Sequence, residues 1–344
     1  MELDSIKQII QDFFFQENTL TFVGSGLSAA EGIPGMSALS NELQSKIPHF
    51  LSDPIDIKLW DKINKDLLAG VGLEQALHNT KPSPHIEDNI RTITANFIGN
   101  AEKKVLYEII NGRKILRFAD YLGHFTIRND GLVVVTTNYD RLIEYACEYK
   151  GIRIDTLFIG RFLAHFAPEK SKYSFCEGLT KRPGKQRTAV FAPKVTVLKP
   201  HGCLSWHMIN GEPYSIPNYP LDDCLIITPG VNKYKEGYSV PFDTHRTKAN
   251  AAIDRAQRYI IIGYGFGDGH LETHLIQQLN AGKPALLLTH SLSPRALELT
   301  RKCKHITAIC SDGADGSTIV TATSETSIPH INLWDLKSML KEVF

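Results

Sequence analysis

The chain has 344 residues, 42% of them hydrophobic and 22% charged, which is ordinary for a globular protein of one large or two modest domains. The net charge of +1 does not indicate strong binding to nucleic acid or to a membrane surface. We interpret the densest basic stretch as a solvated loop; it consists of Lys181, Arg182, Lys185 and Arg187. No apolar run approaches the ~20 residues that span a bilayer, and the N-terminus lacks a secretory signal, so we expect a cytoplasmic protein without membrane attachment.

The first third of the chain contains one strand followed by a long helical region. An amphipathic helix is predicted over 5–16 and a buried strand over Leu20–Val23. Between residues 36 and 127, apolar residues recur at helical intervals and prolines mark helix boundaries, so we predict a helical insertion of four or five helices.

The rest of the chain alternates strands with helices. Strands are predicted over 131–136, 195–198, 259–263, 285–288 and 306–309, and helices over 140–149, 244–257, from 269 to Leu279, and over 293–304 and 331–342. Residues 151–190 are expected to be irregular, 205–214 to form a small hairpin around Asn210-Gly211, and 311–327 to form a flexible loop.

This alternation predicts an α/β fold, namely a Rossmann-like, doubly wound, mainly parallel sheet with a helical insertion. We expect a single domain over 1–344. Its parts are a core at 20–35 and 128–310, the insertion at 36–127, and a loop with a C-terminal helix at 311–344.

Unusual residues follow four of the predicted strands. They are Gly24-Ser-Gly26, Thr136-Thr-Asn138-Tyr-Asp140, His201-Gly202 and Gly263-Tyr-Gly265-Phe-Gly267-Asp268. Ligands of open α/β sheets bind at the carboxyl ends of strands, so we expect these segments to meet at one site.

The first of these segments resembles a dinucleotide-binding turn. It fits G-x-G-x-x-A through Gly24, Gly26 and Ala29, but the acidic residue that a dehydrogenase needs about 20 residues later is missing. Taken alone, Asn138 and Asp140 could be helix caps or turn residues, and His201 could be either a structural histidine or a base.

Together, the segments resemble the sirtuin family. Gly24 to Pro34 is similar to the sirtuin G-A-G-x-S-x-x-x-G-I-P, Thr136 to Asp140 to T-Q-N-x-D, and His201-Gly202 to H-G. Gly263-Tyr-Gly265 stands where sirtuins have G-T-S. The segments occur in family order over roughly residues 20–290, which implies a SIR2/DHS-like fold.

The chain also departs from the sirtuin deacylases. It has Pro34-Gly35-Met36-Ser37 where they continue P-D-F-R, and its six cysteines form no C-x-x-C pair, so we expect no metal. The Gly263-Tyr-Gly-Phe-Gly-Asp268 loop and the helical insertion instead resemble the SIR2-like subunits of bacterial antiphage systems, which cleave NAD+ to nicotinamide and ADP-ribose.

The resemblance implies a regulated NAD+ hydrolase with NAD+ as its substrate. Asn138 would orient the ribose or the attacking water, and His201 would act as general base. The NAD+-binding residues implied are Gly24, Ser25, Gly26, Leu27, Ser28, Ile33, Pro34, Asp140, Gly263, Tyr264, Gly265, Asp268, Thr289 and His290.

Two other functions stay open at this stage, an NAD-dependent protein deacylase and a non-catalytic sensor that binds NAD+ or ADP-ribose. The residues also leave open NADP+ as substrate and cyclisation of the ADP-ribose product. For the favoured hydrolase we expect homo-oligomers and a separately encoded sensor subunit, such as a HerA-like ATPase or another nucleotide-recognising enzyme.

Overall fold

The protein is described from a computed structural model covering residues 2–125, 131–180, 187–230 and 239–344. Outside these ranges lie the expected boundary at 127/128 and three residues of the basic stretch, Lys181, Arg182 and Lys185. In the part of the chain that is described, no helix has both the length and the apolar character needed to cross a bilayer.

The main sheet of the described chain has nine strands in the order β16-β15-β14-β13-β12-β1-β2-β8-β3. Their bounds are β1 (Thr19–Val23), β2 (Leu132–Thr136), β3 (Arg153–Asp155), β8 (Lys194–Leu198), β12 (Arg258–Ile262), β13 (Ala285–Leu288), β14 (Ile306–Ser311), β15 (Ser317–Val320) and β16 (Glu325–Ile328). All pairs from β14 to β3 are parallel, whereas β15 and β16 are antiparallel. The predicted doubly wound, mainly parallel α/β fold is confirmed.

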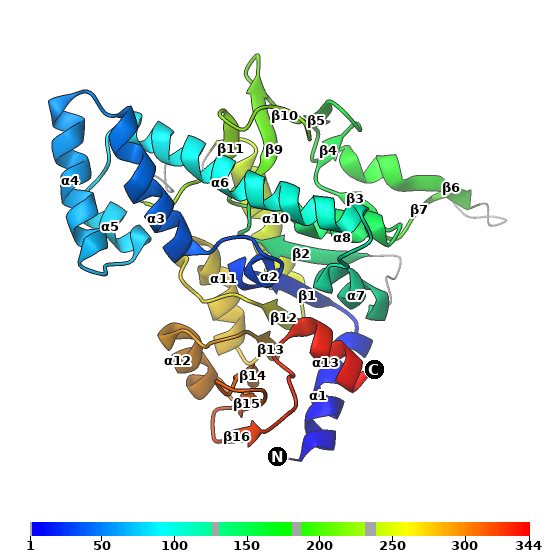
Figure 1. Cartoon of the computed structure of the whole chain (residues 1–344). Coiled ribbons are helices and arrows are strands. Elements are labelled where there is room, and N and C mark those ends of the chain that lie inside the picture. Colours follow the sequence, from blue (N-terminus) through cyan, green and yellow to red (C-terminus); the bar gives the residue numbers. More distant parts are fainter. Residues whose placement is uncertain (1, 126–130, 181–186, 231–238) are drawn as a thin grey trace.

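Helices cover both faces of this sheet (Figure 1). One face packs against α1 (Leu3–Phe15), α7 (Arg117–His124), α8 (Leu142–Tyr149) and α13 (Leu336–Val343), and the other against α10 (Phe242–Arg255), α11 (Gly269–Asn280) and α12 (Pro294–Lys302). Successive strand residues face opposite cores. In β1, Phe22 faces the second group of helices and Val23 the first. Burial on both faces explains why the central strands are apolar throughout.

The segment before β2 is helical, as predicted. It contains α2 (Ser25–Ala30), α3 (Met36–Lys46), the 3-10 helix η1 (Ile47–Phe50), α4 (Pro54–Leu68), α5 (Leu73–Asn79) and α6 (Pro84–Ile110), followed by α7. Trp60, Ile63 and Leu43 belong to a separate apolar core shared by α3 to α6. Helices α3, α4 and α5 lie together at one side of the molecule, and α6 runs from them across it (Figure 1).

A second sheet of the described chain, in the order β11-β9-β10-β5-β4, stands above the carboxyl edge of the main sheet (Figure 1). Its strands are β4 (Phe158–Ile159), β5 (Ala164–Phe166), β9 (Gly202–Ile209), β10 (Glu212–Ser215) and β11 (Cys224–Ile226). The predicted hairpin is confirmed as β9–β10, and its turn residues Asn210 and Gly211 both have positive φ, as a tight hairpin turn requires.

Two sequence-based expectations were wrong. Residues 151–190 contain β3, β4, β5, the 3-10 helix η2 (Ser171–Phe175), β6 (Cys176–Thr180) and the first part of β7 (Thr188–Phe191) instead of an irregular segment. Residues 311–327 contain β15 and part of β16 instead of a flexible loop. These strands have two to five residues, too few to give a periodic pattern.

Several helix boundaries also differ from the prediction, and side-chain capping explains one of them. The C-terminal helix α13 begins at Leu336, not 331, because the Asp335 side chain caps it by accepting from Ser338 N at 3.0 Å. Helix α8 begins at Leu142 instead of Asp140, and Asp140 Oδ1 accepts from Leu142 N at 3.2 Å.

Candidate active site at the carboxyl edge of the sheet

The glycine turn after β1 packs directly on the backbone that follows β12. A Cβ on Gly24 would lie 2.5 Å from Gly263 O, and a Cβ on Gly26 would lie 2.7 Å from Gly263 Cα. Gly263 itself has φ +61°, and a Cβ there would lie 2.5 Å from Leu27 N. Close backbone approach therefore requires glycine at all three positions.

Most backbone donors of this turn are already used. Gly24 N donates to Ile262 O at 2.9 Å, Gly26 N to Gly263 O at 2.9 Å, and Leu27 N to Gly24 O at 3.3 Å. Within the described residues, Ser25 N donates no hydrogen bond outside its helix, and Ser25 is exposed. Among the described backbone bonds of Gly24 to Leu27, Ser25 N is therefore the donor left without a backbone acceptor.

Asn138 joins the end of β2 to the glycine turn. Its Nδ2 donates to Gly24 O at 3.0 Å and to Ser28 Oγ at 2.8 Å, and its own N donates to Thr136 Oγ1 at 3.1 Å. Asn138 and Ser28 are only 7% and 5% exposed. Two side-chain hydrogen bonds thus fix the amide in one orientation at the sheet edge, and the third holds the backbone of Asn138.

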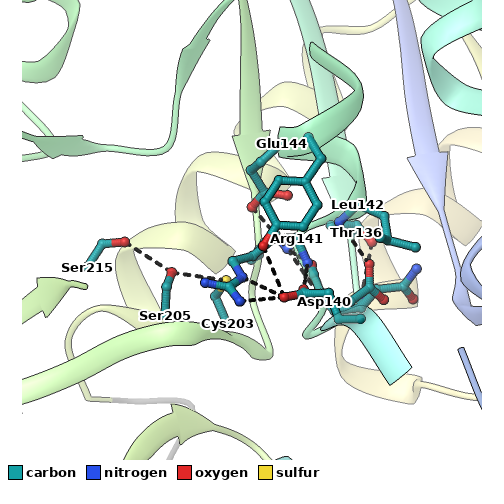
Figure 2. Close-up of polar contacts among 12 residues, drawn as sticks. Thr136, Asp140, Arg141, Leu142, Glu144, Cys203, Ser205 and Ser215 are labelled. Carbon is teal, nitrogen blue, oxygen red and sulfur yellow. Dashed lines mark hydrogen bonds and ion pairs between the residues drawn. The ribbon is translucent and has the colours of Figure 1, made fainter. Parts of the chain in front are cut away.

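Asp140 is buried close to this amide. Burial raises the pKa of its carboxyl group, although Lys199 and Ser28 act in the opposite direction. Figure 2 shows Asp140 and Arg141 of the β2–α8 connection, with Leu142 at the start of α8, on one side, and Cys203 and Ser205 of β9 on the other.

Lys199, which was not among the predicted site residues, links the carboxyl end of β8 to the carboxyl end of β2. Its Nζ donates to Asp140 O and lies 3.5 Å from Asn138 O and 3.0 Å from Glu144 Oε1. Lys199 is 1% exposed, and its neighbours Cys203 and Glu144 outweigh burial and raise its pKa, so it remains charged. The buried ammonium group of Lys199 therefore holds the loop that contains Asn138. In the chain, Lys199 lies two residues before His201.

Glu102 of α6 fixes the same connection from the helical side. This carboxylate is 1% exposed and accepts from Arg141 N at 2.5 Å and from Tyr145 OH at 3.1 Å, and it pairs with the Arg141 guanidinium. The helical segment is thereby bonded to the β2–α8 connection.

His201 follows β8 and faces the loop after β12. Its Nε2 lies 2.6 Å from Asp268 Oδ2, and the two side chains are 12% and 9% exposed. Asn138 is thus bonded to Gly24 and Ser28, and His201 contacts Asp268. Lys199, two residues before His201 in the chain, is bonded to carbonyl groups of the Asn138 loop.

Several other predicted site residues make contacts within the protein itself. Leu27 and Ile33 belong to the apolar core, and Tyr264 is buried with its hydroxyl donating to Glu272 Oε1 at 2.9 Å. Pro34 is half-buried, and Gly265 O accepts from Ser293 Oγ at 2.5 Å.

Thr289 and His290 follow β13 at the same edge of the sheet. Thr289 Oγ1 donates to Ser291 O at 3.1 Å, and the exposed His290 packs edge-on against Trp334. No group of three or more His, Cys, Asp or Glu in the described ranges is arranged to hold a metal ion.

Comparison with known proteins identifies a family. A family model described as SIR2-like domain matches residues 132–309, more than half of the chain. No curated protein matches the sequence. Among solved structures, one described as "The Structural basis of Sirtuin Substrate Affinity" is 13% identical, covers 100% of this chain and 98% of its own, and has a TM-score of 0.43. Another, a SIR2 homolog–NAD complex, is 14% identical, covers 99% and 93%, and also has a TM-score of 0.43.

Proposed function

We propose that this chain, which belongs to the SIR2-like domain family, is an NAD+ hydrolase that cleaves NAD+ to nicotinamide and ADP-ribose. The observation that carries the proposal is a fixed amide, Asn138, bonded to the glycine turn after β1, together with an imidazole, His201, that follows β8, the parallel neighbour of β2. Simple binding of a nucleotide needs neither of these groups. Family membership supports NAD+ as the molecule on which they act.

The bond to be broken joins C1′ of the ribose to the nicotinamide nitrogen. Nicotinamide leaves with the bonding electron pair and becomes neutral, so the ribose passes through an oxocarbenium-like transition state. Catalysis then needs orientation of the ribose, placement of a water and removal of its proton.

Each of these tasks has a candidate residue. The amide of Asn138 orients the ribose or the water, and His201 removes the proton. Asp140 contacts the carboxamide of nicotinamide. For the pyrophosphate, the hydrogen-bond pattern favours Ser25 among the turn residues, with the Ser28 hydroxyl as a further contact. Thr289 and His290 lie on the side proposed for the adenosine half.

The reaction can be tested directly. Purified protein is incubated with NAD+ or NADP+, with and without an acylated peptide, and nicotinamide, ADP-ribose and cyclic ADP-ribose are separated by chromatography. Product without peptide supports hydrolysis, turnover only with peptide identifies a deacylase, and binding without product identifies a sensor.

Two variants test the site. We expect Asn138→Ala and His201→Ala each to lower kcat by about 10²-fold or more, the usual contribution of a positioned acid–base group. His330→Ala is the matched control, because His330 is exposed and pairs with Asp315 elsewhere on the surface. Undiminished cleavage in both site variants would contradict the assignment.

A cytoplasmic NAD+ hydrolase would deplete the cell's NAD+ and therefore needs control. We propose that it acts in antiphage defence, is assembled as a homo-oligomer, and is triggered by a separately encoded sensor such as a HerA-like ATPase. Activity that appears only when the encoded neighbour and its trigger are added would support this scheme, and full activity of the isolated chain would oppose it.

A further inference from the structure

Arg141, the residue after Asp140, joins three parts of the molecule. Its backbone N donates to Glu102 Oε2 of α6 at 2.5 Å, and its Nε donates to Glu102 Oε1 at 2.8 Å. Its Nη1 donates at 2.6 Å to Pro217 O, in the segment that follows β10. One residue thereby bonds the loop after β2 both to the helical segment and to the chain that leaves the second sheet.

Glu102 receives donors on both of its carboxylate oxygens. Besides the contacts above, its Oε1 accepts from Arg141 Nη2 and from Tyr145 OH, the latter at 3.1 Å. Glu102 lies in the C-terminal half of α6, whereas Ile86 and Ile90 of the same helix belong to the separate apolar core of α3 to α6. A single continuous helix therefore runs from that core to Arg141.

The Glu102–Arg141 pair is shielded from water. The two side chains are 1% and 13% exposed. Burial lowers the pKa of Arg141, but the charge and hydrogen bonds of Glu102 outweigh burial and raise it, so the guanidinium stays charged. Desolvation of a buried ion pair offsets most of its attraction, and apolar side chains in its place often keep or raise stability. What the pair adds is direction, because a planar guanidinium fixes the angles of its bonds.

That direction is imposed on the loop of the candidate site. The loop from Asn138 to Arg141 is bonded to the glycine turn at its first residue and to α6 at its last. Between them, the Tyr139 hydroxyl donates to Ile227 O at 2.6 Å. A shift of Arg141 would therefore reach the Asn138 amide through a backbone of only a few residues.

We propose that Glu102 and Arg141 are positioning residues for the hydrolysis proposed above, and that their ion pair makes the helical segment part of the catalytic apparatus. They act through the Asn138 amide and the Asp140 carboxylate, and not on NAD+ itself. The inference rests on the proposed function for its effect on turnover, but not for the order that the pair imposes on Asn138.

The test removes both charges together. In Glu102→Gln/Arg141→Met, the amide that replaces the carboxylate still offers an acceptor to the backbone N at position 141 and a partner to Tyr145 OH, and no unpaired charge is buried. We expect kcat to fall about tenfold or more, because a small misplacement of a catalytic group is costly. Urea unfolding should show stability equal to or above that of the wild type. Unchanged kcat, whatever the stability, would overturn the proposal.

A matched control removes another buried pair. Lys194 and Asp155 join β8 to β3, and their side chains are 17% and 4% exposed. We expect Lys194→Met/Asp155→Asn to leave kcat unchanged, and an equal fall in this control would assign the loss to general disruption and overturn the positioning role. Arg141→Lys keeps the charge without the planar fork, so it should retain part of the kcat that the double variant loses.

Proton NMR of asparagine-labelled protein tests the positioning without turnover. The side-chain amide of Asn138, assigned by its absence from Asn138→Asp, should exchange slowly with water in the wild type and about tenfold faster or more in Glu102→Gln/Arg141→Met. The control pair should leave it unchanged. Equal exchange in the wild type and the double variant would overturn the inference. If exchange accelerates in a protein that does not cleave NAD+, the proposed function fails and the role of the pair in ordering Asn138 stands.

Discussion

At the scale of single residues, the three glycines at the sheet edge are required by close packing of the backbone. The turn after β1 and the end of β12 approach so closely that a methyl group at Gly24, Gly26 or Gly263 meets backbone atoms at 2.5–2.7 Å. A sequence-based interpretation assigns such glycines to a ligand, whereas the structure gives them a partner within the protein.

Gly263→Ala tests this contact. We expect a loss of about 2 kcal/mol or more in the free energy of unfolding, because alanine is strained at φ +61° and its Cβ would lie 2.5 Å from Leu27 N. Gly267→Ala is the control, since a Cβ there meets nothing within 4 Å. Urea unfolding of both variants measures the difference, and equal stabilities would show that the backbones can separate without cost.

Residue types at strand ends made part of the site predictable. Asn138 and His201 each follow a short buried strand, so their arrival at one edge follows from parallel topology. Lys199 and Glu272 were not predictable, because their roles depend on Asp140, Glu144, Tyr264 and Asp268, contacts that no local spacing specifies.

At the scale of elements, α10 packs against the end of β8 through a buried histidine. His245 of α10 is 0% exposed, and its Nδ1 accepts from Lys199 N at 3.2 Å. Its ring lies against Trp206 of β9 with ring centroids 4.5 Å apart. Burial, with smaller contributions from Lys199 and Lys248, lowers the pKa of His245 to about 3.

This histidine predicts acid sensitivity. Between pH 6.5 and about 3, His245 is protonated in the unfolded chain but neutral in the folded protein. The free energy of unfolding therefore falls as pH falls, by about 1.4 kcal/mol per pH unit. Above pH 6.5 both states are neutral and the effect vanishes.

Urea unfolding at pH 6.5 and pH 5 measures this effect in the wild type and in His245→Gln, which keeps an acceptor but does not titrate. We expect the variant to lose about 2 kcal/mol less stability than the wild type over this interval. His274→Gln, at a half-exposed histidine paired with Asp254, is the control. Equal losses in all three proteins would contradict the assignment.

Elements buried on both faces were the predictable ones. The strands β1, β2, β8, β12 and β13 were located because parallel strands under two layers of helices are apolar throughout. The hairpin β15–β16 was missed because its Ser- and Thr-rich sequence resembles a loop. It becomes a strand pair only because β14 offers an edge on which Ile319 and Val320 can be buried.

At the scale of the whole molecule, the switch point of the sheet locates the site. The chain runs from β1 to β2 and β8 on one side and returns through β12 and β13 on the other, so the crevice opens where β1 and β12 are neighbours. The sequence predicted the strands and a site at their carboxyl ends, but not their order in the sheet. Of the second sheet only the β9–β10 hairpin was predicted, because the pairing of β10 with β5 joins strands that lie far apart in the sequence.

The oligomeric state is a property of the whole molecule that can be tested. We expect the purified protein to form a homo-oligomer, and large apolar side chains that are 74–84% exposed, at Leu68, Ile110 and Phe162, are available for contacts between copies. Light scattering across a range of concentrations gives the mass in solution. A mass of one chain throughout would remove homo-oligomers from the proposed scheme.

The backbone contact between the β1 turn and Gly263 has a consequence for how relatives of this chain are to be sorted. If the glycines are demanded by the architecture, a descendant could lose its chemistry and still keep every one of them. The glycine pattern would then trace ancestry, while Asn138 and His201 would separate working enzymes from inert copies of the same scaffold.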